Sequence, residues 1–259
     1  MNIKKHIPNA ITCGNLLCGC LAIVKAFEGD LVWAAYLVGI AAVLDFFDGF
    51  AARMLKVSSP IGKDLDSLAD MVTFGVVPGV VMFQLMKGAM FYYNASHIIS
   101  DYNSGKTISS IVLYFAFLIP IFSAIRLAKF NNDTRQSESF IGLPTPANGI
   151  FICSLGMFVN NSDDVFFTLN NWIIEIVTNP YILICLIILL SYLLIAELPL
   201  FALKFKHFKW TGNEIRFLFL GLCLIILVTL QFVGIPLIII LYVLLSVINN
   251  IFSKSKSVE

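Results

Sequence analysis

Four aspartates at the ends of long apolar segments are the residues of this sequence best placed to do chemistry. Asp45 and Asp48 stand near the end of the second apolar segment, and Asp66 and Asp70 stand at the start of the third. Spacings of three and four residues put each pair on one face of a helix. Because a carboxylate at membrane depth is costly unless it faces a polar cavity, a partner or an ion, these aspartates predict a polar site.

The link between the two segments is expected to bring both pairs to one end of a helical hairpin. It runs through Ser58, Ser59 and Pro60 and is short, so the two helices should be antiparallel neighbours. Four like charges in one pocket repel, so they take up protons or bind cations, and carboxylates prefer hard cations such as Mg²⁺, Mn²⁺ or Ca²⁺. Four carboxylates suit two such ions better than one. A two-metal site favours phosphoryl transfer, because it neutralises phosphate and stabilises the attacking and leaving oxygens.

Residues suited to a phosphorylated ligand stand among these carboxylates. Gly49 and Ala52 lie three residues apart on the aspartate-bearing segment, where small side chains let a bulky group approach the backbone. Arg53 follows, and its guanidinium is suited to phosphate oxygens. Gly62 lies in the link. The pattern therefore predicts a phosphate-bearing ligand beside the metals.

The elements that position these residues are predicted to be membrane-spanning helices. The chain has 259 residues, of which 59% are hydrophobic and 13% are charged, against about 25% charged in a soluble domain. Apolar blocks of about 20 residues predict membrane helices, and the short alternating segments of a transmembrane barrel are not found. The expected fold is an all-α integral membrane protein with about eight spans, at residues 9–27, 31–54, 67–90, 107–130, 145–161, 180–198, 214–231 and 234–252. The last two could form a tight hairpin or one broken helix.

The distribution of basic residues predicts the orientation, whereas the net charge of +1 says little about partners. No nucleic-acid partner is expected. With both termini in the cytoplasm, 14 of the 17 lysines and arginines fall on the cytoplasmic side. They are Lys4, Lys5, Arg53, Lys56, Lys63, Arg126, Lys129, Arg135, Lys204, Lys206, Lys209, Arg216, Lys254 and Lys256. The opposite side holds Lys25, Lys87 and Lys106. This bias predicts an even number of spans in the cell (inner) membrane with both ends inside.

The aspartate region resembles the signature of the CDP-alcohol phosphotransferase family. It reads Asp45-x-x-Asp48-Gly49-x-x-Ala52-Arg53, then eight residues, then Gly62-x-x-x-Asp66-x-x-x-Asp70, and it matches every fixed position. The resemblance implies a six-helix catalytic core, a homodimer, and a polar cavity open to the cytoplasm. It also implies a CDP-linked lipid donor, release of CMP, and two divalent cations, Mg²⁺ or Mn²⁺. The expected organisation is a core over residues 1–200 with an additional C-terminal transmembrane hairpin over residues 201–259.

The resemblance also implies roles for individual residues. Asp45, Asp48, Asp66 and Asp70 would bind the metals, and Asp70 would in addition be the base for the incoming hydroxyl. The residues expected along the nucleotide and its phosphates are Gly49, Ala52, Arg53 and Gly62.

Further stretches resemble the branch of this family that makes phosphatidylserine from CDP-diacylglycerol and L-serine. They are Pro8-Asn9-x-x-Thr12-x-x-Asn15, Asp66-Ser67-Leu68-Ala69-Asp70 continuing to Phe74-Gly75-Val76-Val77-Pro78-Gly79, Arg126-Leu127-Ala128-Lys129-Phe130-Asn131, and Phe140-Ile141-Gly142-Leu143-Pro144-Thr145-Pro146-Ala147. The resemblance implies that Asn9, Thr12 and Asn15 contact cytidine or phosphate. Asn9 or Thr12 could instead cap the first helix.

The acceptor residues are expected at the end of the fourth segment. Arg126 or Lys129 could hold the carboxylate of serine, although basic residues at a span end are also common topology anchors. Asn131, Asn132 or Glu138 could contact the rest of serine. The same chemistry on glycerol 3-phosphate, inositol phosphate or choline stays open as an alternative. A cation transporter is a further alternative, although the sequence lacks the repeated halves common in transporters.

Overall fold

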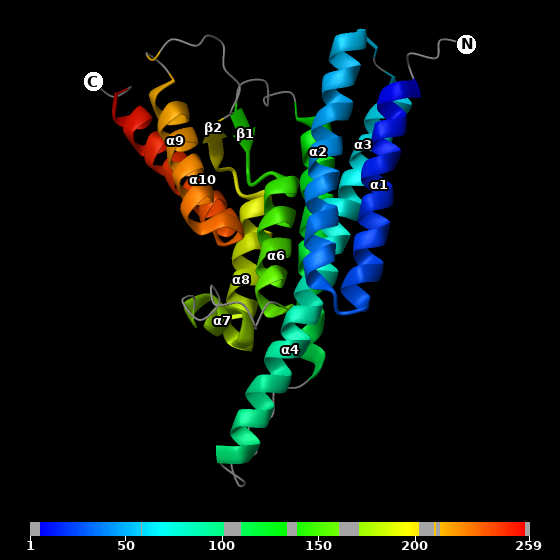
Figure 1. Ribbon diagram of the computed structural model, residues 1–259. Helices are drawn as coiled ribbons and strands as arrows, with labels where there is room; N and C mark the ends of the chain where they lie inside the picture. The colour runs from blue at the N-terminus through cyan, green and yellow to red at the C-terminus, as the bar shows by residue number, and fades with distance from the viewer. Residues whose placement is uncertain are drawn as a thin grey trace.

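The computed structural model describes residues 6–57, 59–100, 110–133, 139–160, 171–201, 210 and 213–256. Most of these residues are helical, which confirms the predicted all-α membrane class (Figure 1). The elements are α1 (His6–Phe27), α2 (Leu31–Leu55), α3 (Pro60–Asp70), the π-helix η2 (Met71–Val76), α4 (Val77–Ser100), the 3-10 helix η3 (Ser110–Phe117), α5 (Leu118–Asn132), β1 (Ser139–Ile141), α6 (Thr145–Asn160), α7 (Asn171–Thr178), α8 (Pro180–Ile195), β2 (Pro199–Phe201), α9 (Glu214–Leu230), the 3-10 helix η4 (Gln231–Val233) and α10 (Gly234–Lys256).

The helices account for all eight predicted apolar segments. Among the described residues, five helical ranges are long and apolar enough to cross a membrane, namely 6–27, 31–55, 60–94, 110–132 and 214–250. Two shorter apolar helices, α6 and α8, cover the fifth and sixth segments. The range 214–250 contains both α9 and α10, which pack against each other as a hairpin, and α9 ends at Gln231, whose φ is 48°. The chain is therefore an integral membrane protein, and its last two segments are a hairpin rather than one broken helix.

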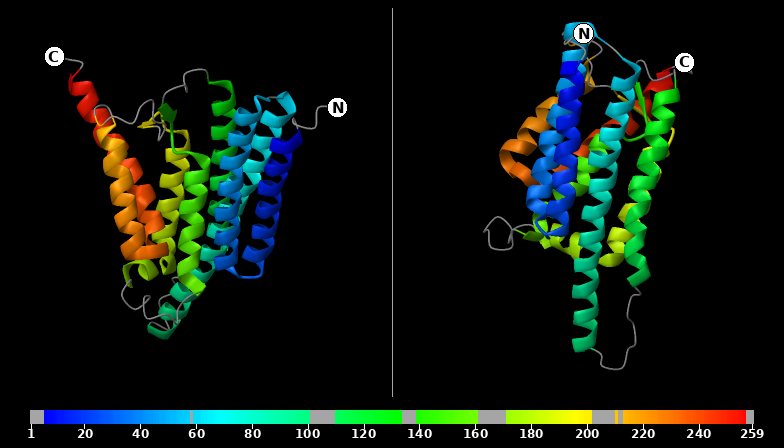
Figure 2. Two further views of the ribbon diagram at one scale, coloured as in Figure 1. Left: turned by 45° about the horizontal axis from the view of Figure 1, so that its top comes forward. Right: turned by 90° about the vertical axis from the view of Figure 1, so that its right-hand side faces the viewer.

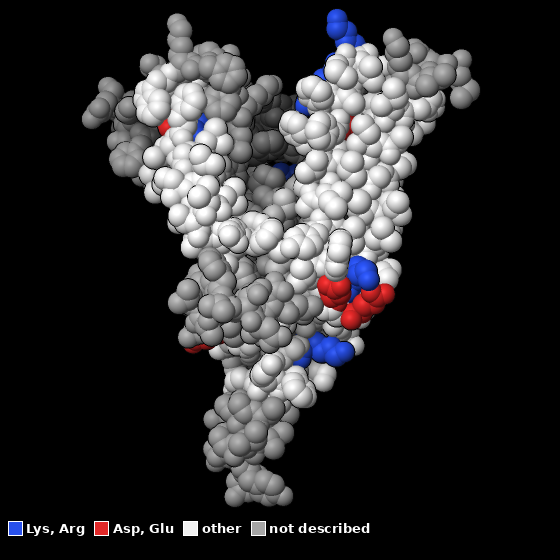
Figure 3. All heavy atoms as spheres, in the orientation of Figure 1, with Lys and Arg blue, Asp and Glu red and all other residues white. Residues whose placement is uncertain are grey.

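The surface of the helical bundle is apolar, as expected for a protein in a bilayer. Large hydrophobic side chains such as Phe46, Leu224 and Val228 are exposed, while Phe74, Met86 and Ile119 form part of the buried core. On the face drawn in Figure 3, charged side chains gather in an upper and a lower group, and the surface between the two groups is nearly free of charge. Such a surface matches the hydrocarbon layer of a membrane, where charged side chains are rare.

Both ends of the described chain lie on the same side of the bundle. Figure 1 and Figure 2 place the start of α1 and the end of α10 at one end, together with the α2–α3 link, β1 and β2. This arrangement agrees with the predicted even number of spans. The side chains of several residues used in the charge argument lie outside the described part, namely Lys4, Lys5, Lys106, Arg135, Lys204, Lys206, Lys209, Lys254 and Lys256.

Local signals explain the α2–α3 hairpin. Helix α2 ends at Leu55 and is capped by Lys56, which adopts the left-handed conformation with φ 52°. Ser59 then caps α3, its Oγ accepting the Gly62 N–H at 3.0 Å, and Pro60 occupies the first helical turn. A serine cap followed by proline is a typical helix start. The serine side chain accepts a hydrogen bond from a free backbone N–H, and proline has no N–H that would need a partner. The hairpin expected from the short link is therefore present.

Two described elements were not expected from the sequence. The short helix α7 precedes α8, and the strands β1 and β2 form an antiparallel two-stranded sheet at the same end as the α2–α3 link. The strands are three residues each and lie more than fifty residues apart in the chain. Neither has a run long enough for sequence periodicity to reveal it.

Candidate active site

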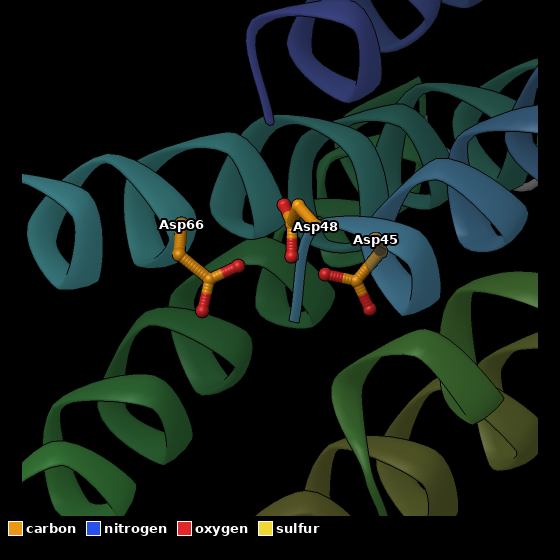
Figure 4. Close-up of side chains that lie close together, drawn as sticks. All are labelled: Asp45, Asp48 and Asp66. Atoms are coloured by element: carbon orange, nitrogen blue, oxygen red, sulfur yellow. The ribbon is translucent and has the colours of Figure 1, made fainter. Parts of the chain in front are cut away.

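The aspartates of α2 and α3 converge between the two helices. Asp45, Asp48 and Asp66 each offer a carboxylate oxygen, and these atoms all lie within 4.8 Å of one another (Figure 4). Asp70 is hydrogen-bonded to Asp45. Helix periodicity explains the convergence, since Asp45 and Asp48 share one face of α2 while Asp66 and Asp70 share one face of α3.

The donor set fits a hard divalent cation. Mg²⁺, Mn²⁺ and Ca²⁺ prefer oxygen ligands at about 2.0–2.6 Å. Carboxylate oxygens within 4.8 Å of one another are close enough to bind one such ion together. Asp45, Asp48 and Asp66 meet that condition directly. Asp70 is hydrogen-bonded to Asp45 but is not one of the three carboxylates that share this spacing. No His or Cys joins the cluster among the described residues, so its chemistry is that of carboxylates alone.

Helix α1 supplies polar partners to two of the carboxylates. The Thr12 hydroxyl lies 2.6 Å from Asp48 Oδ2 and 3.1 Å from the Pro8 carbonyl oxygen. The Asn15 amide Nδ2 donates to Asp70 Oδ1 at 3.5 Å. Asn15 is fully buried, and its Oδ1 has no hydrogen-bond partner in the described structure. These two side chains of α1 orient Asp48 and Asp70.

These positions correct one alternative drawn from the sequence. Asn9 and Thr12 were considered as caps of the first helix, but both lie inside α1, which already includes His6. A capping residue sits just before the helix, so neither residue has that role. The signal that could have identified Thr12 as a neighbour of Asp48 is its i, i+3 spacing with Asn15, which puts both on one face of α1.

A cavity of about 240 Å³ adjoins the carboxylates. It is lined by residues of α1, α2, α3 and the link between the last two, namely Pro8, Asn9, Thr12, Asp48, Gly49, Ala52, Val57, Ser59, Gly62, Lys63 and Asp66. Five of the seven residues predicted to contact the nucleotide or its phosphates are among them, and Asn15 and Arg53 are not. Arg53 is exposed, and its Nη1 lies 3.6 Å from the position that a Cβ at Gly49 would take. Arg53 therefore stands beside the cavity rather than in its wall.

Two features of this cavity were not anticipated. A Cβ at Gly62 would lie 3.0 Å from both Asn9 Oδ1 and Ser59 Oγ, so the glycine lets α1 and α3 come close at this point. Lys63 lines the cavity and donates through Nζ to the Asn131 carbonyl oxygen at 3.1 Å. Lys63 thus joins α3 to the end of α5, a contact between distant segments that no local pattern in the sequence predicts.

The three predicted acceptor residues occupy different environments on α5. Arg126 is buried, donates from Nε to the Leu143 carbonyl oxygen at 3.0 Å, and interacts electrostatically with Asp70. Lys129 is exposed. The Asn131 amide Nδ2 donates to Ser67 Oγ at 2.8 Å and so joins α5 to α3.

Of the other acceptor candidates, the Asn132 amide Nδ2 donates to the Ala128 carbonyl oxygen at 2.9 Å within α5. Glu138 lies outside the described residues. Figure 3 shows the molecule hollowed between the α9–α10 hairpin and α2, with basic side-chain atoms inside the hollow. Among the described candidates, Arg126 is the one with an electrostatic interaction with Asp70.

Known proteins with similar sequences share the segment that holds these residues. A model of the CDP-alcohol phosphatidyltransferase family matches residues 5–195. The CDP-diacylglycerol–serine O-phosphatidyltransferase of Bacillus subtilis (strain 168) is 32% identical over 209 residues, which are 81% of this chain and 94% of that protein. The protein of the same name from Helicobacter pylori (strain 26695) is 36% identical over 147 residues, 56% of this chain and 54% of that one. An archaetidylserine synthase of Methanothermobacter thermautotrophicus is 28% identical over 162 residues, 60% of this chain and 61% of that one.

Proposed function

Because this chain belongs to the CDP-alcohol phosphatidyltransferase family, we propose that it transfers the phosphatidyl group of CDP-diacylglycerol to the hydroxyl of L-serine. The products are phosphatidylserine and CMP. The observation that carries this proposal is the convergence of Asp45, Asp48 and Asp66 within 4.8 Å beside a cavity lined by donor-binding candidates. The names of the bacterial relatives state the same reaction, and the archaeal relative is named for a serine lipid.

The four aspartates would hold two divalent cations, Mg²⁺ or Mn²⁺. Cations bound there neutralise the diphosphate of the donor and stabilise the attacking and leaving oxygens. Thr12 keeps Asp48 in place through its hydroxyl, and Asn15 does the same for Asp70 through its amide. Partners of this kind fix the orientation of ligand carboxylates before the ion arrives.

Asp70 is the base. It accepts the proton of the serine hydroxyl, the oxygen then attacks the phosphorus that bears diacylglycerol, and the bond to CMP breaks. General-base catalysis of this kind contributes about 10²–10⁴-fold to a rate. Asp70 interacts electrostatically with Arg126, so an acceptor held by Arg126 would present its hydroxyl to this carboxylate.

The nucleotide half of the donor would occupy the 240 Å³ cavity. Asn9, Gly49, Ala52 and Gly62 form its walls, and the small side chains let the nucleotide approach the helix backbones. Arg53 would reach the phosphates from beside Gly49. Thr12 also lines the cavity, but its hydroxyl is occupied by Asp48, so its main part is to position a metal ligand.

Arg126 is the best candidate for the carboxylate of serine. It is buried and its Nε–H is occupied by the Leu143 carbonyl, so the two terminal nitrogens of the guanidinium can bind a carboxylate in a bidentate way. Lys129 is exposed, which favours the role of an anchor at the membrane surface. Asn131 holds α5 against α3 and would support the acceptor site indirectly.

The same proposal places the active site and both termini in the cytoplasm. Serine and CMP are water-soluble, whereas the lipid donor enters from the bilayer, and the bias of basic residues puts the α2–α3 link on the cytoplasmic side. The working unit would be a homodimer in the cell (inner) membrane. Residues 1–200 would form the catalytic core and residues 201–259 the additional hairpin.

The test is CMP release by the purified protein in detergent. CDP-diacylglycerol and Mn²⁺ or Mg²⁺ are supplied with L-serine, glycerol 3-phosphate, inositol phosphate, choline or no acceptor. We expect serine-dependent release that falls by about 10²-fold or more in Asp70→Asn. Asp64→Asn, an exposed carboxylate on the same helix, is the matched control and should stay near the wild-type rate.

Each other outcome has a distinct meaning. Release that depends on glycerol 3-phosphate, inositol phosphate or choline would keep the chemistry and overturn the acceptor. An Asp70→Asn variant as active as the wild type would remove Asp70 as the base. If folded protein that binds metal released no CMP with any alcohol, cation transport would become the better hypothesis.

A further inference from the structure

A series of hydrogen bonds begins at the buried arginine of the acceptor site. The Arg126 Nε–H donates to the Leu143 carbonyl oxygen at 3.0 Å. The segment that carries this carbonyl is bound in turn to the end of α8. The Leu143 N–H donates to the Leu193 carbonyl oxygen, and the Gly142 N–H donates to the Leu198 carbonyl oxygen, both at 2.9 Å. The orientation of Arg126 thus depends on where residues 142–143 sit against α8.

Gly142 fixes this contact tightly. Its φ is +76°, and a Cβ there would lie 2.7 Å from the Leu194 carbonyl oxygen and 3.0 Å from that of Ala196. Glycine adopts this conformation at no steric cost, and only glycine leaves room for the carbonyls. The turn therefore has little freedom to shift without moving the Leu143 carbonyl.

The second half of the network comes from the C-terminal helix. Strand β1, which leads into Gly142, pairs with β2, and β2 is held from its other side by α10. The Tyr242 hydroxyl donates to the Phe201 carbonyl oxygen at 2.9 Å, and the Asn250 amide Nδ2 donates to the Pro199 carbonyl oxygen at 2.5 Å. The rings of Tyr242 and Phe201 meet edge to face with centroids 5.0 Å apart.

We propose that Tyr242 and Asn250 of α10 are positioning residues for the acceptor half of the active site. By holding β2, they hold β1 and the Gly142 turn, and so place the Leu143 carbonyl that orients the Arg126 guanidinium toward Asp70. This inference rests on the proposed function, in which Arg126 binds the acceptor carboxylate. It gives the C-terminal hairpin, which lies beyond residues 5–195, a part in recognising the acceptor.

The position of Tyr242 also favours a local effect on Arg126. The two side chains interact electrostatically, and Tyr242 is also bonded to β2. The network acts on α5 and the turn before α6, whereas the donor cavity is built from α1, α2, α3 and their link. Loosening the network should therefore change acceptor binding and leave donor binding intact.

The test is the kinetics of Tyr242→Phe, of Asn250→Ala and of the double variant. Tyr242→Phe removes one hydroxyl and keeps the ring contacts. We expect the KM for L-serine to rise roughly three- to ten-fold in each single variant, as for the loss of one hydrogen bond, and further in the double variant. The kcat and the KM for CDP-diacylglycerol should stay within about two-fold of wild type. General destabilisation would not raise the KM for L-serine while leaving these two values unchanged. Thr229→Val is the control, because its hydroxyl bonds only to carbonyls within α9.

A second readout does not depend on which acceptor is used. Phenylglyoxal modifies accessible arginines, and peptide mapping by mass spectrometry follows the rate at Arg126. We expect faster modification of Arg126 in Tyr242→Phe than in wild type or Thr229→Val. The proposal would be overturned if neither the modification rate of Arg126 nor the KM for L-serine changed in Tyr242→Phe. It would also be overturned if kcat and the melting temperature fell while the modification rate and the KM stayed the same. If wild type used another acceptor, the proposed function would fail while the modification rates still decided the network.

Discussion

At the scale of residues, the four aspartates are chemically alike but have different neighbours. Asp48 is bonded by the Thr12 hydroxyl and Asp70 by the Asn15 amide, whereas Asp66 faces Asp45 and Asp48 across the gap between α2 and α3. A carboxylate held by a donor has a fixed orientation, which lowers the entropy lost when an ion binds. Side chains of α1 therefore hold Asp48 and Asp70, to which the proposed mechanism gives the roles of metal ligand and base.

Thr12 offers the sharpest test at this scale. Thr12→Val keeps the shape of the side chain and removes the donor to Asp48, so we expect apparent metal affinity to fall about 10-fold or more. CMP release measured against Mn²⁺ concentration should show a higher midpoint with a nearly unchanged maximum. Thr12→Ser retains the hydroxyl and should behave like wild type. A midpoint equal to wild type in Thr12→Val would show that this bond has no part in metal binding.

At the scale of elements, the α2–α3 link decides how closely the metal ligands approach. Ser59 caps α3, Pro60 starts it, and Gly62 lets it lie against α1. Directly after Asp70 the helix widens into the π-helix η2, a form that occurs often at functional sites. The Thr73 hydroxyl of η2 donates to the Asn15 carbonyl oxygen at 3.3 Å, so η2 also fixes the part of α1 that faces Asp70.

Gly62→Ala tests the contact between α1 and α3. The added Cβ would lie 3.0 Å from Asn9 Oδ1 and from Ser59 Oγ, inside the donor cavity, and these side chains would have to move. We expect the KM for CDP-diacylglycerol to rise several-fold, on the order of five-fold, while the KM for L-serine stays unchanged. Gly88→Ala in α4 is the control, since nothing lies within 4 Å of its added Cβ. Equal donor KM values in the two variants would argue against a nucleotide in this cavity.

At the scale of the whole molecule, the apolar exterior and the polar site agree with one membrane arrangement. The start of α1, the end of α10 and the α2–α3 link share one end of the bundle, and the α1–α2 turn lies at the other end. Lys25 and Glu28 form an ion pair at that turn. An even number of crossings follows from this arrangement. Which end faces the cytoplasm stays a prediction from the basic residues, as do the homodimer and the division at residue 200.

Reporter fusions test the orientation. Green fluorescent protein attached after Glu259 should fluoresce, because it folds in the cytoplasm, and alkaline phosphatase attached there should be inactive. The same reporters placed after Lys106 should give the opposite pattern. Fluorescence at Lys106 with active phosphatase at Glu259 would invert the orientation and move the active site to the other side of the membrane.

The sequence by itself determined the features that depend on short-range geometry. Apolar runs of about 20 residues predict spans, and three- and four-residue spacings place Asp45, Asp48, Asp66 and Asp70 on matching helix faces once a short link closes the hairpin. The family was predicted from the same residues, and the match over residues 5–195 confirms it. These inferences succeed because they join neighbours along the chain.

The tertiary structure decided the contacts between distant segments. The pairing of Thr12 with Asp48 spans 36 residues and that of Asn15 with Asp70 spans 55. The burial of Arg126, the exposure of Lys129 and the link from Tyr242 to β2 likewise depend on how helices pack. The spacing of polar residues along a helix indicates which face they share, but it does not indicate which other helix packs against that face. No local pattern could therefore identify these partners.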